Sequence, residues 1–395
     1  MIQFRKNYDI VVAGGGIAGV AAALSAARRG HKVALLEKQV IIGGLATSGL
    51  IFIYLPLCDG NGKQLLFGIA EELLKRSMKY SPCDLPKRWG GPEKDAFYGF
   101  QHNDRYQVIF SPAGFTIALD EALAEAGVDL WLDTLICAAN TASDGKITSI
   151  EVENVSGRGE LSAKCFIDAT GSAALIRLAG GEVEVGQNYQ TPWIMEKSTG
   201  EHLFAMEEHL GIKSFGKFTP EYLLGNPLDG KVNTGYIRTV WTFARKHYDQ
   251  SYQSGADRHT LYPILLPGMP QFRMIARIVG MKTIGDGDDG KYFDDSIGLY
   301  PDWRKSGKVW ETPYDTLLPE KIRGVLAAGR CISTTGDAWD AFRVIPSAAM
   351  TGEAAGTAAV LALQLNCDPA ELTAELLRTE LRQSGFLFHI EETLS

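Results

Sequence analysis

The sequence predicts an α/β protein with a three-layer, Rossmann-like domain into which a second, α+β domain is inserted. Three observations support this fold class. The chain has 395 residues, enough for two or three packed units of roughly 150 residues each. Its amino end alternates strand, glycine-rich turn, helix and strand patterns. Apolar residues make up 45% of the chain and charged residues 22%, a globular balance that excludes a mainly disordered protein.

Charge and hydropathy exclude further classes. The 47 acidic side chains outnumber the 39 basic ones and give a formal net charge of −8. The field of the protein therefore repels phosphate backbones, and we expect no nucleic-acid partner. No apolar stretch approaches the roughly 20 residues of a membrane helix, and the amino end leads straight into a strand pattern. We therefore expect no membrane span and a cytoplasmic location.

The cysteines show no spacing typical of metal or dithiol chemistry. There is no CxxC pair, no zinc-finger spacing and no iron–sulfur run. We therefore expect reduced thiols, no bound metal and no disulfide-reductase mechanism. The six cysteines are Cys58, Cys83, Cys137, Cys165, Cys331 and Cys367.

The first three elements are a strand, a helix and a second strand. Residues 10–13 and 33–36 are short apolar runs typical of buried strands, and residues 17–29 form an apolar, alanine-rich helical pattern. The second strand ends at Glu37, whose carboxylate can accept hydrogen bonds from the ribose hydroxyls of an adenosine. An acid at this position disfavours a 2′-phosphate, because like charges repel.

The turn between the first strand and the helix carries three glycines spaced as GxGxxG. Gly14 permits the sharp turn, Gly16 lets a pyrophosphate approach the backbone, and Gly19 lets the helix and strand pack closely. The amino end of the helix then faces the anion, where free N–H groups and the helix dipole stabilise negative charge. With the acid at Glu37, this unit predicts a dinucleotide site.

Three later segments also carry glycine-bearing turns. Residues 38–49 form a loop with Gly43 and Gly44 that lets the chain run close along a ligand. A short strand from Cys165 ends in an Ala-Thr-Gly turn at residues 169–171, and the strand at residues 325–328 leads into a Gly-Arg turn. The first motif alone does not separate FAD from NAD, so these later segments decide between the two cofactors.

The four segments together resemble the FAD-dependent oxidoreductases of the glutathione-reductase-like flavoprotein superfamily. The resemblance is greatest to the group in which a segment like AGRCIS is followed by R-x-x-P and an AAG helix, and it covers the ends of the chain and parts of its middle. It implies non-covalent FAD, with the Gly-Arg turn under the ribityl chain and the helix and strand of residues 110–136 passing the adenine. The residues expected to bind FAD are Gly14, Gly16, Ile17, Ala18, Gly19, Glu37, Lys38, Gly43, Gly44, Leu45, Ala46, Thr47, Ile136, Ala169, Thr170, Gly171, Gly329, Arg330, Asp337, Arg343 and Pro346.

Near the carboxyl end, a helix predicted from Pro346 can stabilise the negative charge of a reduced flavin. Proline is favoured in a first helical turn, and the positive end of the helix dipole, with the charge of Arg343, would then face the flavin edge. A salt bridge for Arg343 and a plain buried helix remain the alternative. Asp337 fits either a hydrogen bond with the ribityl chain or the cap of a turn.

The cofactor domain is expected to be discontinuous. The second insertion is rich in aromatic residues and fits a cap that closes over the flavin, since hydride transfer needs a dry, shaped cavity. The predicted divisions are residues 1–51, 106–185 and 311–395 for the FAD-binding domain, and residues 52–105 and 186–310 for the insertion and the substrate or cap domain.

Candidates for the chemistry itself are weak. A general base such as His102 would titrate in the right range, and other histidines of the insertions are equal candidates. The segment PQFRMIARIVG resembles P-x-x-R-x-x-R-R-I-x-G but has Ala276 where a second arginine is frequent. Its Arg273 and Arg277 lie four residues apart, on one face of a helix or a strand. They fit either an anionic-substrate site or scaffold ion pairs, and Arg343 is a further candidate.

These patterns predict an FAD-dependent oxidoreductase that transfers a hydride or electrons between a small organic substrate and flavin N5. The GxGxxG spacing recurs only at Gly285–Gly290, inside the acidic cluster GDGDDGKYFDD, which is typical of a solvated loop. We therefore expect no domain of its own for NAD(P)H. The substrate, the electron donor or acceptor and the oligomeric state stay open. Two alternatives remain: a flavin-bearing electron-transfer subunit of a larger complex, and a non-redox or RNA-modifying flavoprotein.

Overall fold

The centre of the protein is a five-stranded parallel sheet. The structure, a computed structural model, describes residues 1–91, 105–186, 192–200, 202, 205–215 and 225–393. The four strands on one side of β6 are completely buried, which explains their continuous apolar sequences. In spatial order the strands are β19 (Val325–Ala327), β10 (Cys165–Asp168), β2 (Ile10–Ala13), β3 (Val33–Leu36) and β6 (Asp129–Trp131).

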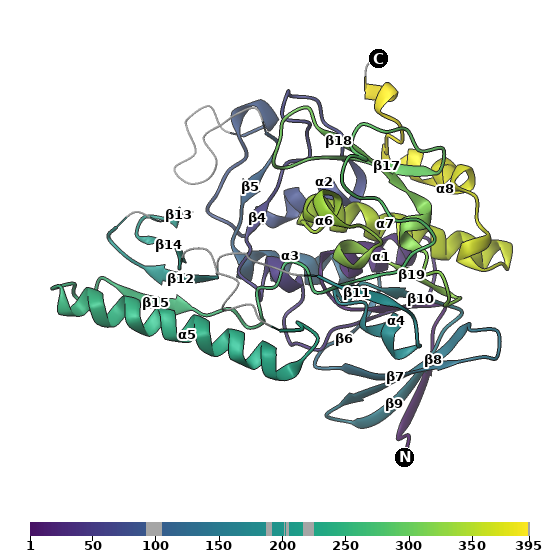
Figure 1. Cartoon of the computed structure of the whole chain (residues 1–395), viewed down its shortest axis with the longest axis horizontal. Helices are drawn as coiled ribbons and strands as arrows, with labels where there is room; N and C mark the ends of the chain where they lie inside the picture. Colours follow the sequence, from purple (N-terminus) through teal and green to yellow (C-terminus); the bar gives the residue numbers. More distant parts are fainter. Residues whose placement is uncertain (92–104, 187–191, 201, 203–204, 216–224, 394–395) are drawn as a thin grey trace.

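Helices and a second sheet cover this sheet. Helices α1 (Ile17–Ala27), α3 (Pro112–Glu125) and α7 (Ile345–Leu365) pack together above it in Figure 1. Below it lies the second sheet, whose strands are β1 (Phe4–Asn7), β9 (Gly157–Ser162), β8 (Ile147–Asn154) and β7 (Leu135–Thr141). The predicted three-layer α/β class is confirmed. The first helix ends at Ala27 rather than residue 29, and the last long helix begins one residue before Pro346.

Small residues let α1 and α7 approach closely. A Cβ atom on Gly352 would lie 2.2 Å from the carbonyl oxygen of Ala18. The hydroxyls of Ser25 and Thr357 lie 3.0 Å apart in the same interface. The glycine and alanine positions of α7 therefore serve helix packing along most of its length.

The first insertion is joined to this core. Strand β4 (Ile53–Tyr54) pairs with β5 (Val108–Ile109), and helix α2 (Gly68–Ser77) packs against α7 and α3. Glu353 of α7 accepts a hydrogen bond from the backbone N–H of Ile69, at 2.7 Å. The carboxylate thereby ties the insertion to the central helix.

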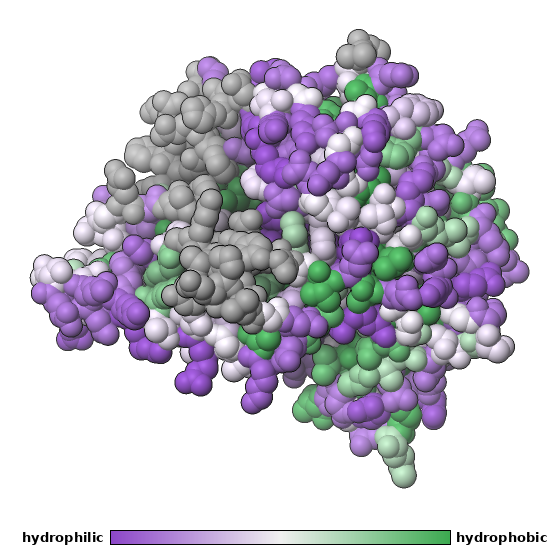
Figure 2. Space-filling view, in the orientation of Figure 1, coloured by the Kyte–Doolittle hydropathy of each residue, from purple (hydrophilic) through white to green (hydrophobic). Residues whose placement is uncertain are grey.

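The cap has a small hydrophobic core of its own. Helix α5 (Gly230–Gln253) lies beside a four-stranded sheet at the left of Figure 1, and Figure 2 shows a mainly hydrophilic surface over the outer end of this helix. The strands of the sheet are, in order, β13 (Ala205–Glu207), β14 (Leu210–Ser214), β12 (Trp193–Lys197) and β15 (Tyr262–Leu265). The buried residues of this second core are Ile194, Tyr236, Val240, Ala244, Tyr248 and Phe272.

Strand pairing favours an end of the cap earlier than the predicted one at residue 310. Strand β11 (Val183–Val185) leads into the cap and pairs with β16 (Ala276–Ile278), which leads out of it. The predicted boundary between residues 310 and 311 falls inside β18 (Val309–Pro313), which pairs with β17 (Ser296–Pro301). This hairpin contributes to the main core, beside α7 and α8 (Ala374–Leu381). We therefore propose that the inserted domain ends near β16.

Two further features concern the apolar helices and the cysteines. Within the described ranges, no helix combines the length and the apolar character that crossing a membrane requires. All six cysteines carry free thiols. The remaining short elements are α4 (Ala174–Leu178) after β10 and α6 (Gly336–Phe342) before α7.

Candidate functional site

A cavity of about 370 Å³ opens at the carboxyl ends of the parallel strands, where open α/β sheets bind their ligands. Each of the four glycine-bearing turns contributes to its wall. The predicted residues that line it are Gly14, Gly16, Ile17, Ala18, Glu37, Lys38, Gly43, Gly44, Leu45, Ala46, Ile136, Ala169, Thr170, Gly171, Gly329, Arg330 and Arg343.

The first two turns are held together by backbone contacts. The N–H of Gly43 donates to the carbonyl of Gly15, at 2.7 Å. Gly14 has a φ of +98°, and a Cβ atom there would lie 2.7 Å from the carbonyl oxygen of Ala169. The first turn therefore also packs directly against the third, and these contacts exclude side chains.

Glu37 joins the first turn to the second strand. Its carboxylate accepts hydrogen bonds from the N–H groups of Gly15, at 2.8 Å, and Gln39, at 3.0 Å. The side chain lines the cavity, and burial raises the pKa of this carboxyl above its usual value. The carboxylate is thus fixed in place with one side toward a ligand.

The cavity fits a dinucleotide with its diphosphate. Helices α1 and α7 both begin at its wall, and no side chain caps either amino end, so their free N–H groups and dipoles favour an anion. A Cβ atom on Gly16 would meet no protein atom within 4 Å, which leaves space for a ligand against the backbone. The buried Oδ1 of Asn233, on the cap side of the wall, accepts no hydrogen bond in the described part of the chain.

Asp168 holds the third turn, and the sequence analysis missed it. The buried carboxylate accepts hydrogen bonds from the N–H of Thr170 at 3.0 Å, from its hydroxyl at 2.7 Å and from the N–H of Ile176 at 3.0 Å. Burial raises the pKa of Asp168. An acid directly before the Ala-Thr-Gly turn is the signal that could have identified it.

Two arginines line the cavity near the amino end of α7. Arg330 donates to the carbonyls of Gly171, at 2.9 Å, and Phe272, at 2.7 Å. Burial, and then the charge of Arg343, lowers the pKa of Arg330 to about 10. Arg343 forms an ion pair with Asp340, at 2.7 Å. Arg343 thus lines the cavity and also forms the salt bridge that the sequence analysis gave as the alternative. Its role beside the flavin stays a prediction.

Three predicted residues lie behind the cavity wall instead of in it. A Cβ atom on Gly19 would lie 1.8 Å from the carbonyl oxygen of Gly14, so Gly19 serves the close packing predicted for it. The hydroxyl of Thr47 donates to the carbonyl of Ile42. Pro346 occupies the first turn of α7, where proline was expected.

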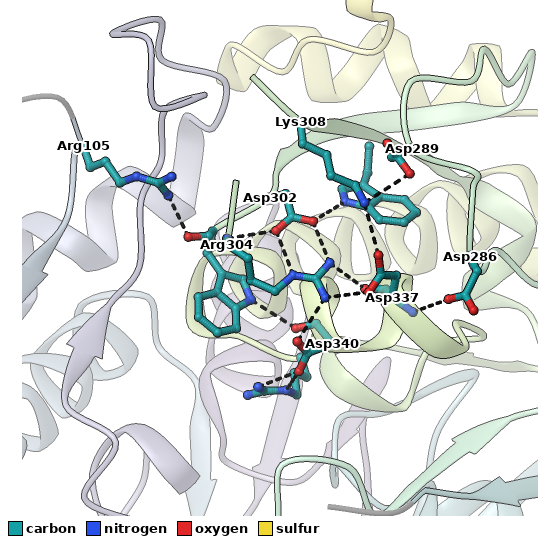
Figure 3. Close-up of polar contacts among 11 residues, drawn as sticks. Arg105, Asp286, Asp289, Asp302, Arg304, Lys308, Asp337 and Asp340 are labelled. Atoms are coloured by element: carbon teal, nitrogen blue, oxygen red, sulfur yellow. Dashed lines mark hydrogen bonds and ion pairs between the residues drawn. The ribbon is translucent and has the colours of Figure 1, made fainter. Parts of the chain in front are cut away.

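Asp337, a predicted ribityl contact, does not line the cavity. Its carboxylate forms ion pairs with Arg304, at 2.9 Å, and Lys308, at 3.2 Å, and its N–H donates to Asp286, at 2.6 Å. These contacts belong to a network of charged residues at the amino end of α6 (Figure 3). Asp337 is therefore engaged outside the cavity, because residues distant in the sequence supply its partners.

The structure shows different surroundings for the candidate catalytic residues that it describes. Arg277 forms an ion pair with Glu184 of β11, at 2.6 Å, which fits the scaffold alternative. Arg273 is buried, and its guanidinium lies 5.4 Å from the centre of the Trp193 ring. His102 lies outside the described residues. Among the described histidines none lines the cavity, and His247 pairs instead with Glu196, at 3.1 Å.

The sequence analysis also missed the wall that the cap contributes. These residues close the cavity opposite the glycine-bearing turns. Three of them lie in the segment PQFRMIARIVG, which was singled out only for its arginines. The residues of this wall are Pro227, Leu228, Asn233, Met269, Pro270, Phe272 and Ile275.

Comparisons with known proteins agree with this geometry. The sequence profile of a family described as FAD dependent oxidoreductase matches residues 9–258 and 290–381. A solved structure, a geranylgeranyl bacteriochlorophyll reductase-like protein from Thermoplasma acidophilum, superimposes with a TM-score of 0.51 at 15% identity, over 99% of this chain and 95% of that one. This last likeness concerns the fold alone.

Curated relatives match parts of the chain. The digeranylgeranylglycerophospholipid reductase of Methanoculleus marisnigri is 29% identical over 173 residues, which are 43% of this chain and 40% of that protein. The vinyl phenol reductase of Lactiplantibacillus plantarum is 28% identical over 217 residues, 49% of this chain and 41% of that protein. The matches thus span about two fifths of the length of these relatives.

Proposed function

Since the chain belongs to the family of FAD-dependent oxidoreductases, we propose that it binds FAD non-covalently in this cavity and transfers a hydride or electrons between a small organic substrate and flavin N5. The observation that carries the proposal is the convergence of four glycine-bearing turns and two uncapped helix amino ends on one cavity. FAD, when bound, supplies the acceptor or donor of the electron pair.

The residues of the chain have distinct roles in this proposal. The first turn and Glu37 bind the adenosine diphosphate half, through backbone N–H groups and a carboxylate. Arg343 and the amino end of α7 stabilise negative charge at the far end of the cavity. The apolar cap residues Met269, Pro270 and Phe272 cover the site and exclude water from it.

Two finer points belong to the same proposal. The second GxGxxG string, Gly285–Gly290, lies among turns and does not open a helix, so it lacks the context of a dinucleotide site. We therefore propose that electrons enter or leave through the substrate or a separate partner and not through an NAD(P)H domain of this protein. We also propose a cytoplasmic location, supported by the free thiols of all six cysteines.

Gly16 offers a test that separates the cofactor site from folding. In Gly16→Ala the added methyl group meets no protein atom within 4 Å, so the fold stays intact while the methyl occupies the space of the diphosphate. We expect the Kd for FAD to rise about tenfold or more, since the tight approach of the backbone to the diphosphate is lost. Fluorescence titration with FAD measures this change.

The matched control is Gly235→Ala on α5. A Cβ atom there also meets nothing within 4 Å, and alanine favours a helix by about 1 kcal/mol over glycine. The control should therefore bind FAD like the wild type. Equal FAD affinity in Gly16→Ala and Gly235→Ala would contradict the proposed site.

A further inference from the structure

Three guanidinium groups gather where the cap meets the cavity. Arg330 donates to the carbonyl of Phe272, the residue before Arg273. Arg273 and Arg330 are both close enough to Arg343 for its charge to disfavour theirs, and burial together with this repulsion lowers the pKa of Arg273 to about 9. The three positive charges therefore lie together in a region of low exposure.

Within the described ranges, carboxylates balance these three charges only in part. Asp340 pairs with Arg343, but its carboxylate is shared with Arg304, at 3.1 Å, within the network of Figure 3. Arg330 donates only to carbonyls, and Arg273 donates to the carbonyl of Gln271, at 2.6 Å. In the described part of the chain neither Arg273 nor Arg330 has a carboxylate partner. Buried cations without a counter-ion are costly, so an anionic ligand is expected beside them.

A bound cofactor would provide a counter-ion for two of the three arginines. Arg330 and Arg343 line the cavity, so they face the bound cofactor. Arg273 is not among the residues that line the cavity, and its guanidinium lies 5.4 Å from the ring centre of Trp193, in β12 of the cap. The side chain of Arg273 is only 6% exposed. Because Arg273 contacts the cap and not the cofactor site, we expect its charge to bind a second anion.

Resting on the proposed function, we infer that the substrate is an organic carboxylate, and that Arg273, supported by Arg343, binds its carboxylate group between the cap and the cofactor. The aromatic rings near Arg273 indicate the chemistry of the rest of the substrate. Phe272 lines the cavity and lies 4.6 Å from the ring of Tyr236. An aromatic or other apolar body therefore fits beside the carboxylate better than a highly polar one.

The substrate class is tested by calorimetric titration of the purified holoprotein. The probes are acetate, succinate and benzoate, each against its uncharged amide. We expect the carboxylates to bind more tightly than the amides, with benzoate the tightest because of its apolar ring. A charge-assisted hydrogen bond is worth about tenfold to a hundredfold in affinity. If no carboxylate binds more tightly than its amide, the inference is wrong.

Variants assign the effect to Arg273. Arg273→Gln should raise the Kd for benzoate about tenfold or more while leaving that for benzamide nearly unchanged, and Arg273→Lys should restore part of the affinity. Arg277→Gln is the matched control: it removes a positive charge four residues away, from a side chain paired with the half-exposed Glu184. The control should bind benzoate like the wild type.

The FAD content of each variant separates the two proposals. Arg273→Gln should keep its FAD, as measured after denaturation. Loss of FAD from Arg273→Gln, but not from Arg277→Gln, would assign Arg273 to the cofactor and overturn the inference. A wild-type protein that binds benzoate but no FAD would instead contradict the proposed function.

Discussion

The cofactor domain and the cap hold themselves together in different ways. In the cofactor domain, backbones touch: Gly352 of α7 lies against the carbonyl of Ala18 in α1. In the cap, α5 packs a stripe of side chains of mixed size, from Tyr236 to Tyr248 at intervals of four residues, against the sheet. The first kind of contact requires glycine at fixed positions, whereas the second accepts many side chains. The packing of the cofactor domain therefore constrains residue type more tightly than the packing of the cap does.

The largest effect is expected in the backbone contacts of the cofactor domain. In Gly352→Val the side chain would overlap the carbonyl oxygen of Ala18, 2.2 Å from its Cβ atom. Such overpacking costs about 3 kcal/mol or more, and it displaces the helix that borders the cavity. We expect a lower free energy of unfolding together with loss of FAD. Chemical denaturation and FAD content measure both, and a variant that is destabilised but keeps FAD affinity would show that this interface does not shape the site.

A smaller effect is expected in the core of the cap. Val240→Ala removes two methyl groups from a completely buried position and should cost about 2 kcal/mol. Because the cap has its own core, we expect faster amide hydrogen exchange in α5 with little change in exchange of β2, β3 and β10. FAD should remain bound. Simultaneous loss of protection in both regions would mean that the two cores fold as one.

The smallest effect concerns a single carboxylate of the cofactor site. Glu37→Gln replaces an acceptor of two backbone N–H groups and should weaken FAD binding about tenfold. Burial raises the pKa of Glu37, so it takes up a proton at a higher pH than an ordinary glutamate. FAD affinity of the wild type should therefore fall as the pH falls through this raised pKa, and the variant should lack this part of the dependence.

Asp337→Asn is the control for this measurement. Its carboxylate is engaged with Arg304 and Lys308 outside the cavity, and such exposed pairs contribute about 1 kcal/mol or less. We expect its pH profile of FAD binding to match that of the wild type. A profile that changes in Asp337→Asn and not in Glu37→Gln would return the ribityl role to Asp337.

The contrast between backbone contacts and side-chain packing also explains how much of the site could be predicted from the sequence. Gly14, Gly16 and Gly43 were placed correctly at the cavity because their positions depend on backbone geometry that a short motif records. The ion pairs of Asp337 could not be predicted, because its partners, near residue 304, are distant in the sequence and leave no local pattern.

The two arginines of the cap segment show the same limit. Arg273 and Arg277 look alike in the sequence, and only the pairing of β11 with β16 brings Glu184 to Arg277 and leaves Arg273 without a carboxylate among the described residues. The cap wall around Phe272 was missed because apolar side chains at a cavity look like those of any core. Contacts between residues that are distant in the sequence therefore determine the roles that local motifs do not predict.

The most direct test is the visible spectrum of the purified protein, followed by analysis of the supernatant after denaturation. We predict a yellow protein that releases FAD into the supernatant in an equimolar amount. A correctly folded protein that is colourless and does not take up added FAD would contradict the central claim that the four turns form one FAD site.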